Sequence, residues 1–336
     1  MTSRELVYRT LEFENKTGKV PRQMWTLPYS EWNYPDMIKK IRCDYPEDII
    51  GAPNILGERT IEEGDPYRKG TSRDAWGCLV ENIFEGIIGE VRTPLVQDED
   101  WEDVSQIHIP KEWLTFDREE VNRFCENTDC FVLSTCCPRP FEQLQFIRKT
   151  ENLYMDLLDI PEGMKKFMER MHAFYCELLE EWAKTKVDAL TFMDDWGSQR
   201  SLLINPAIWR EIFKPMYRDY IEIDKRHGKK IFMHSDGFIL DILPDLIEMG
   251  LDAVNSQIFC MGLDALEPLA GKITFWGEID RQHLLVEGTR DDIRKAVQRV
   301  KETLWREGGC IAQCEFGPGA KPENVYEVYE AWEEVR

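Results

Sequence analysis

Short apolar runs alternate with longer amphipathic stretches through the second half of the chain. Each run starts with apolar or β-branched residues and ends in polar ones. The runs are Val187–Asp195, Lys229–Asp236, Asp252–Gln257, Lys272–Asp280 and Gly309–Phe316, and the earlier segments Cys130–Thr135 and Asp48–Ile50 have the same character. Continuous apolar runs separated by helices are typical of a parallel sheet that is covered on both faces. These segments are therefore predicted to be strands.

The stretches between the runs carry helix-terminus signals. Asn205 followed by Pro206 predicts an N-cap and a first helical position, for a helix that extends toward His227 with a kink or break at Pro215. The residues from Thr289 to Asp292 predict an acidic first turn. Further helices are predicted for 161–184, for 294–306 and after Pro322.

Residues 57–110 do not follow this rhythm. They are rich in Gly, Asp, Glu and Trp, which is typical of hairpins and loops. Because no linker or low-complexity stretch divides the chain, residues 1–336 are predicted to form one domain, a (β/α)₈ TIM barrel of the α/β class that carries this segment as an insertion. A doubly wound sheet is the alternative, but no Gly-rich phosphate-binding turn follows any predicted strand.

Charge and composition narrow the classes of partner. The formal net charge is −21, which disfavours nucleic acid and anionic membrane surfaces because both would be repelled. The charged N-terminus lacks the apolar stretch of a signal peptide, and no apolar run reaches the length of a membrane span. The ten cysteines are therefore interpreted as reduced thiols of a cytoplasmic protein.

Polar side chains end all five of the later predicted strands. In a TIM barrel the active site lies at the carboxyl ends of the strands, so these positions are the candidates for chemistry. One polar strand end is usually a turn or a helix cap, but five together are poorly explained in that way. The residues are Asp194, Asp195, His234, Asp236, Asn255, Gln257, Glu278, Asp280, Cys314 and Glu315.

His234 and Asp236 are the core of a candidate metal site. They are separated by one residue, so on a strand both side chains point to the same side. With Cys314 at the end of a later strand they would make an N/O/S set suited to zinc. Asp236 could instead hold the imidazole by its other nitrogen, and Cys314 could be a nucleophile with His234 as its base. A structural histidine is the remaining interpretation.

Tryptophan and glutamine side chains are the candidate substrate contacts. Trp196 and Trp276 lie at strand ends, in DDWG and FWGE, and Trp76 lies in the DAWG of the insertion. Together with Gln199 and Gln257 they would line a pocket for an apolar or cationic small molecule. A packed aromatic rim is the alternative.

Four segments together resemble the uroporphyrinogen decarboxylase superfamily: DDWGSQRSLLINPAIWREIFKPMYRDYI, HSDG, KITFWGEIDRQ and CEFGPGAKPENV. The resemblance extends from about Pro21 to Val335 and implies a (β/α)₈ barrel. In the decarboxylase branch an Arg-rich stretch, RQAGRY, grips the carboxylates of the porphyrinogen. Here Pro21–Ser30 reads PRQMWTLPYS and lacks the second arginine, so decarboxylation of uroporphyrinogen is not expected.

The other branch of the superfamily consists of zinc-dependent methyltransferases that work with corrinoid proteins. Their His-x-Cys motif resembles His234-Ser-Asp236, with Asp in place of Cys, and their later cysteine matches Cys314. The resemblance therefore implies a zinc site of His234 and Cys314, which Glu278 or Asp236 would complete. An oxygen-rich ligand set is better suited to polarising an ether oxygen than to holding a thiolate.

The resemblance thus predicts a methyltransferase that demethylates a methoxylated or methylamine-type substrate and passes the methyl group to cobalamin carried by a partner protein. Asp194 or Asp195 would supply the general acid. A cofactor-free decarboxylase or lyase that acts on a smaller acid is the alternative, with Asp194, Asp195 and Asp236 as acid–base groups. A non-catalytic binding protein is the third hypothesis, and a homodimer would be ordinary for the superfamily.

Overall fold

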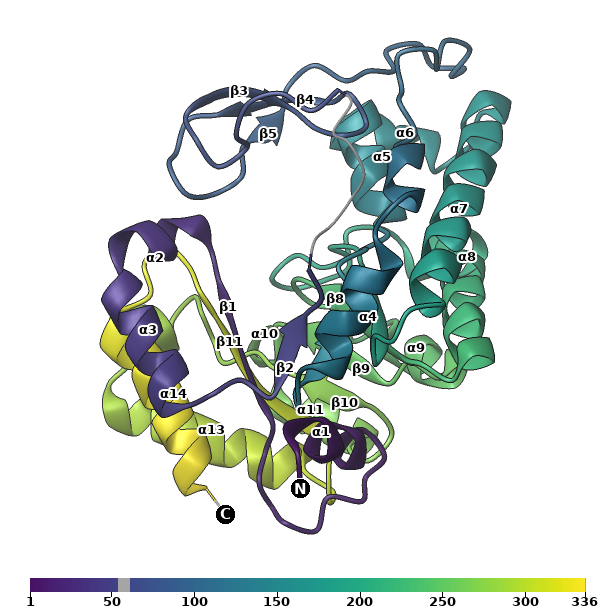
Figure 1. Cartoon of the computed structure of the whole chain (residues 1–336). Helices are drawn as coiled ribbons and strands as arrows, with labels where there is room; N and C mark the ends of the chain where they lie inside the picture. The colour runs from purple at the N-terminus through teal and green to yellow at the C-terminus, as the bar shows by residue number, and fades with distance from the viewer. Residues whose placement is uncertain (54–60, 336) are drawn as a thin grey trace.

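A computed structural model describes residues 1–53 and 61–335. Eight parallel strands follow one another around a nearly closed barrel in chain order (Figure 1). They are β1 (Arg22–Thr26), β2 (Ile49–Gly51), β6 (Phe131–Leu133), β7 (Ala189–Met193), β8 (Lys230–Ser235), β9 (Ala253–Ser256), β10 (Thr274–Trp276) and β11 (Cys310–Phe316). Between β1 and β2 the main-chain N–H of Asp48 donates to the carbonyl of Arg22 at 2.8 Å. The predicted (β/α)₈ barrel is confirmed.

Strand β1 was not among the predicted strands. It pairs in parallel with β11 over its whole length, from Arg22 opposite Ala312 to Thr26 opposite Phe316. Every strand predicted from the apolar runs is present. Each is shorter than its run except β2, which is shifted by one residue from Asp48–Ile50. Strand β1 lies between β11 and β2 and so closes the barrel between its last strand and the rest of the sheet.

The two faces of each strand contribute to different apolar clusters. One cluster takes residues from seven strands, such as Ile49, Phe232 and Ile311, together with Val7 and Leu11 of α1 (Ser3–Leu11). This cluster is the barrel interior, and α1 covers the end opposite the strand carboxyl termini. Alternate residues of β11, among them Cys310 and Cys314, belong to the larger cluster between strands and outer helices. Such alternation follows from the two-residue period of a strand.

The outer helices begin where the sequence signals place them. The side chain of Asn205 accepts the N–H of Ala207 at 2.8 Å, and Thr289 forms a reciprocal capping box with Asp292. Helix α8 continues through Pro215 without a break. The principal outer helices are α4 (Arg118–Glu126), α5 (Pro140–Arg148), α6 (Thr150–Asp156), α7 (Glu162–Ala183), α8 (Pro206–His227), α9 (Leu243–Met249), α13 (Arg290–Leu304) and α14 (Pro322–Glu334). Two further helices follow β1, α2 (Pro28–Asn33) and α3 (Pro35–Asp44). Three short helices lie near the later strands, α10 (Ile258–Met261), α11 (Leu263–Leu266) and α12 (Leu284–Glu287).

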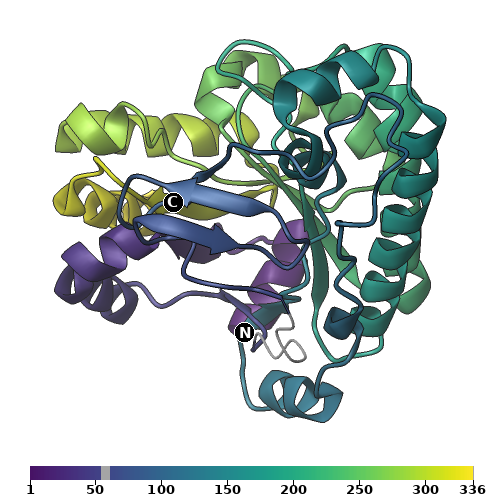
Figure 2. The ribbon, with the colours of Figure 1, turned by 90° about the horizontal axis from the view of Figure 1, so that it is seen from above.

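The predicted insertion forms a separate three-stranded antiparallel sheet of β3 (Gly70–Arg73), β4 (Leu79–Asn82) and β5 (Glu90–Val91). It leaves the barrel after β2 and lies over the carboxyl ends of the strands (Figures 1 and 2). Residues 57–60 of the predicted insertion lie outside the described residues. At Gly86, with φ +83°, a Cβ would come within 2.4 Å of the Tyr29 main chain, so glycine permits the insertion to approach α2.

No helix in the described part of the chain combines the length and the apolar character needed to cross a membrane.

Candidate active site at the barrel mouth

Three side chains at the ends of β7 and β8 converge on one point of the barrel mouth, the end of the barrel at which the carboxyl termini of the strands lie. The Nε2 atom of His234 lies 3.5 Å from Oδ1 of Asp195 and 3.8 Å from Oδ1 of Asp236. One ligand atom from each residue lies within 4.8 Å of the other two, and all three side chains are partly exposed. The main-chain N–H of Asp236 donates to Asp195 at 2.9 Å, which ties the two strand ends together. The structure therefore brings together His234, Asp195 and Asp236.

Asn255 on β9 orients the imidazole of His234. Oδ1 of Asn255 lies 2.6 Å from Nδ1 of His234. The amide nitrogen of Asn255 donates to the carbonyl of Trp276 and, at 3.1 Å, to Oε1 of Gln313. Because both amide hydrogens are used in this way, Oδ1 faces the imidazole as an acceptor and Nδ1 carries the proton. Nε2 is then the ring nitrogen that faces the two carboxylates.

Arg281 lies among three carboxylates on the other side of Asp236. It donates to Asp236 and, at 2.6 Å, to Oε1 of Glu315, and its Nε lies 3.3 Å from Oε1 of Glu278. The guanidinium offsets much of the negative charge of the mouth. Its side chain is 20% exposed, so solvent screens these pairs only in part.

Glu278 is buried and has no hydrogen-bond donor of good geometry at Oε1. Burial raises its pKa well above the ordinary value, the carboxylates of Asp236, Glu315 and Asp280 raise it further, and Arg281 lowers it. The pKa of Glu315 is also raised, first by burial. A buried carboxyl whose pKa is raised holds its proton more tightly than an exposed one and can serve as a proton donor to a bound molecule.

Asp194 is not available at the mouth as a general acid. It is fully buried and accepts the main-chain N–H groups of Phe141 at 3.1 Å and Glu142 at 2.7 Å, at the start of α5. The hydroxyl of Tyr217 donates to it at 2.5 Å. Burial raises the pKa of Asp194, and these three donors oppose that rise. Its place in the structure is that of an N-terminal anchor for α5.

Cys314 also lies elsewhere than the sequence interpretation placed it. It is completely buried on the outward face of β11, where its thiol contacts the hydroxyl of Tyr329 on α14 at 3.5 Å. Burial raises the pKa of this thiol to about 12. Its neighbour Glu315 points to the mouth instead, since successive strand residues face opposite sides. Among the described residues, neither Cys314 nor Glu278 joins the ligand group of His234.

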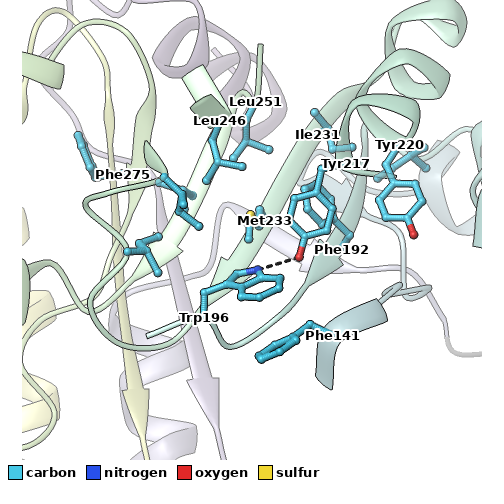
Figure 3. Packing of buried hydrophobic residues seen from close by; sticks show 14 of the residues in the cluster. Phe141, Phe192, Trp196, Tyr217, Tyr220, Ile231, Met233, Leu246, Leu251 and Phe275 are labelled. Atoms are coloured by element: carbon cyan, nitrogen blue, oxygen red, sulfur yellow. Dashed lines mark hydrogen bonds between the residues drawn. The ribbon is translucent and has the colours of Figure 1, made fainter. Parts of the chain in front are cut away.

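The three tryptophans expected to contact substrate are all buried. Trp196 stacks on Phe141 at 4.0 Å between ring centroids and donates to the hydroxyl of Tyr217 at 2.8 Å (Figure 3). Trp276 packs inside the barrel, where it donates to Gln23 at 2.8 Å. Trp76 packs edge-on against Phe174 of α7. The packed-aromatic interpretation therefore describes these rings, because their large apolar area is removed from water.

Gln199 and Gln257 do meet at the mouth. The amide nitrogen of Gln199 donates to Oε1 of Gln257 at 2.8 Å. Both line a pocket together with Phe259, Cys260, Glu278 and Arg281. A second hollow, between β5 and α5, reaches Asp195 and Glu142.

The arginine kept from the decarboxylase-like stretch does not face the mouth. Arg22 pairs with Glu333 on α14 at 2.9 Å and lies 4.0 Å from Asp48. Its neighbour Gln23 points into the barrel instead, toward Trp276. At the mouth Arg281 is already surrounded by carboxylates, so this arrangement is unsuited to a substrate with many carboxylates.

The sequence analysis did not predict the presence of Arg281 at the site or the partners of Asn255 and Glu315. No pattern in the sequence distinguishes Arg281 from other basic residues, because its contacts with the carboxylates depend on how the loops fold. The side chains of Asn255 and Glu315 were predicted strand ends, but their partners, His234 and Arg281, lie on other strands or loops. Two-residue alternation from Ile311, an interior residue, would have assigned Glu315 rather than Cys314 to the inside.

Comparisons with known proteins place the chain. The sequence pattern of the family described as "Uroporphyrinogen decarboxylase (URO-D)" matches residues 74–335, more than three quarters of the chain. A methyltransferase from Methanosarcina mazei aligns over 99% of both chains with a TM-score of 0.72 at 14% identity, which shows a shared fold. A 3-keto-D-glucoside 4-epimerase, YcjR, from E. coli gives a TM-score of 0.39 at 12% identity, covers 64% of this chain and 83% of that one, and carries no argument. No curated protein sequence gives a significant match. The chain belongs to the uroporphyrinogen decarboxylase family.

Proposed function

We propose that this chain is a methyltransferase that takes a methyl group from a small methoxylated or methylamine-type compound and passes it to a corrinoid protein, with zinc at the barrel mouth. The observation that carries the proposal is the convergence of His234, Asp195 and Asp236 at the ends of neighbouring strands. Family membership and the fold shared with the Methanosarcina mazei methyltransferase support it.

The geometry of these three residues fits a zinc ion. Zinc–nitrogen and zinc–oxygen distances of about 2.0–2.2 Å in a tetrahedron put neighbouring ligand atoms about 3.4 Å apart. The separations of 3.5 Å and 3.8 Å from Nε2 of His234 lie close to that value. Three protein ligands leave one coordination position open, which is the arrangement of catalytic rather than structural zinc sites.

Zinc bound there would act as a Lewis acid that polarises the ether oxygen or amine nitrogen of the methyl donor. Asn255 would hold the His234 imidazole in the tautomer that leaves Nε2 free. Arg281 would offset the charge of Asp236 and Glu315.

Glu278 is our candidate for the general acid in place of Asp194. As the methyl–oxygen bond breaks, the electron pair stays on oxygen and the methyl group goes to the acceptor. The proton of Glu278, whose pKa is raised first by burial, would neutralise that oxygen. Glu278 lines the same pocket as Gln199 and Gln257, whose amides can hydrogen bond a polar substrate group. An acidic mouth favours a neutral or cationic methyl donor over a polyanionic one.

Zinc content and methyl transfer together test the proposal. Purified wild type and the variants His234→Ala and Cys314→Ser are compared for zinc per chain. Each is then assayed with a panel of methoxylated aromatics and methylamines, with free cob(I)alamin as the methyl acceptor and its conversion to methylcobalamin followed by absorbance. We expect His234→Ala to lose one zinc and the methyl transfer, and Cys314→Ser to keep both.

Equal zinc content in the wild type and His234→Ala would contradict the metal site. Release of CO₂ from a small carboxylic acid by metal-free protein, without any methyl transfer, would instead support the cofactor-free lyase. Methyl transfer that survives in His234→Ala would contradict the assigned role of His234.

A further inference from the structure

A second cluster of ligand atoms lies on the outer wall of the barrel, between α7 and α8. His172 and Cys176 are one turn apart on α7, and Asp219 faces them from α8, which runs alongside (Figure 1). Nε2 of His172 lies 2.8 Å from Oδ2 of Asp219 and 3.6 Å from Sγ of Cys176. One ligand atom from each residue lies within 4.8 Å of the other two. The cluster and the mouth set are the two such groups in the described part of the chain.

The histidine ring is held with one nitrogen toward the cluster. Nδ1 of His172 lies 3.4 Å from the hydroxyl of Tyr220, a fully buried residue of α8. At the other nitrogen, the Nε2–H of His172 donates to Oδ2 of Asp219, and a cation held by these two residues would take the place of that proton. Metal-binding histidines are commonly oriented by a hydrogen bond at the nitrogen that does not bind the metal.

Of the two separations from Nε2 of His172, the one to Cys176 is close to that of tetrahedral coordination and the one to Asp219 is shorter. Zinc–sulfur and zinc–nitrogen distances of about 2.3 and 2.0–2.1 Å put the two ligand atoms about 3.5 Å apart. Sγ of Cys176 lies 3.6 Å from Nε2 of His172 and 3.9 Å from Nδ1, so a turn of the imidazole would direct Nε2 at an ion shared with the sulfur. Asp219 would have to move outward by about half an ångström to reach the 3.4 Å expected for nitrogen and oxygen, and its side chain is 55% exposed and free to do so.

We infer that His172, Cys176 and Asp219 form a second metal site, which takes a zinc-like divalent cation and joins α7 to α8. Imidazole, thiolate and carboxylate together suit zinc better than magnesium or calcium, which prefer oxygen alone. Water would complete the coordination, since the His172 side chain is 21% exposed. This inference does not rest on the proposed function, because the cluster shares no residue with the mouth.

The charge balance at this site is favourable for a cation. Cation binding forms the metal–sulfur bond and releases the thiol proton to solvent, so that a thiolate and a carboxylate face the metal. Glu180 is occupied by Arg226 and by His227, the latter at 2.8 Å.

Cobalt(II) tests the site, because a cobalt–thiolate bond has a charge-transfer absorption that oxygen and nitrogen ligands do not give. The probe is Co²⁺ added to reduced full-length protein that carries His234→Ala. We expect one equivalent to produce the thiolate band. Adding Cys176→Ser to this protein should abolish the band, and adding Asp219→Asn should keep it with affinity weakened by about tenfold or more.

Cys260→Ser is the matched control, because Cys260 is the half-buried cysteine that lines the pocket at the mouth. This variant should keep the band. Absence of the band from both wild type and His234→Ala protein would overturn the inference, as would a band that persists in Cys176→Ser. Failure of the zinc site at the mouth would leave the band unchanged, so the two proposals fail independently.

Discussion

Asp224, at the end of α8, makes the stability of this protein depend on pH. Its side chain is 1% exposed, and neither carboxylate oxygen has a hydrogen-bond partner. Burial raises its pKa from 3.8 to about 8, Asp252 adds to the rise, and Lys230, Lys229 and Lys225 oppose it. Asp224 therefore stays protonated in the folded protein at neutral pH, whereas it is ionised in the unfolded chain.

The sign of the effect follows from proton binding. Between the two pKa values the folded state binds more protons than the unfolded state at this position, so the free energy of unfolding falls as pH rises. The slope is at most about 1.4 kcal/mol per pH unit, and the contribution is constant below the unfolded pKa and above the folded one. Across the difference between 3.8 and about 8 the loss amounts to at most about 6 kcal/mol.

Asp224→Asn removes the titration and keeps the shape of the side chain. The variant and the wild type are unfolded in urea in the presence of a chelator, at constant ionic strength, from about pH 5 to about pH 9. We expect the advantage of the variant to increase by up to about 1.4 kcal/mol for each pH unit until about pH 8, and then to level off.

Asp264→Asn is the control for this experiment. Its side chain is 86% exposed and pairs with Arg299 at the surface, so the difference from wild type should be small and nearly independent of pH. A constant difference between Asp224→Asn and wild type over the same range would refute the reasoning, and so would an advantage that shrinks as pH rises.

Three further predictions concern the site. Asp194→Ala should lower the free energy of unfolding by about 2–4 kcal/mol in urea unfolding, because two main-chain N–H groups and the Tyr217 hydroxyl lose their acceptor; a loss of methyl transfer at unchanged stability would contradict this structural role. Asn255→Ala should weaken zinc binding about 10–100-fold in a chelator competition, because His234 loses the acceptor that orients it; unchanged affinity would exclude Asn255 as the positioning residue. Arg281→Met should strengthen binding of a divalent cation, because Asp236 loses a competing positive charge. Weaker binding by this variant would show instead that Arg281 holds the carboxylates in place.

The apolar runs were sufficient to predict the barrel strands from β6 onward. Each of these runs is buried on both faces, so its hydrophobicity is continuous and visible in one dimension. Strand β1 has the sequence RQMWT, in which polar and apolar residues are mixed. Its pairing partner β11 lies almost the whole chain length away. Nothing local distinguishes such a strand from a loop.

The candidate site was predicted in part, because the positions of the strand ends could be inferred from the sequence. The carboxyl ends of parallel strands meet at one rim, so the polar strand ends predicted that Asp195, His234 and Asp236 would lie at that rim, although not that these three would form one group. Which face each residue presents depends on the register of its strand. One residue of difference on β11 places Cys314 against Tyr329 and Glu315 beside Arg281.

The sequence by itself determined the strand-and-helix order, the helix caps at Asn205 and Thr289 and the acidic character of the mouth, because these depend on neighbouring residues and on composition. Only the tertiary structure decided that Asn255 orients His234, that Asp194 anchors α5, and that three tryptophans are buried. These assignments depend on contacts between residues far apart in the chain. Such contacts exist only when the barrel has closed and each strand has its register.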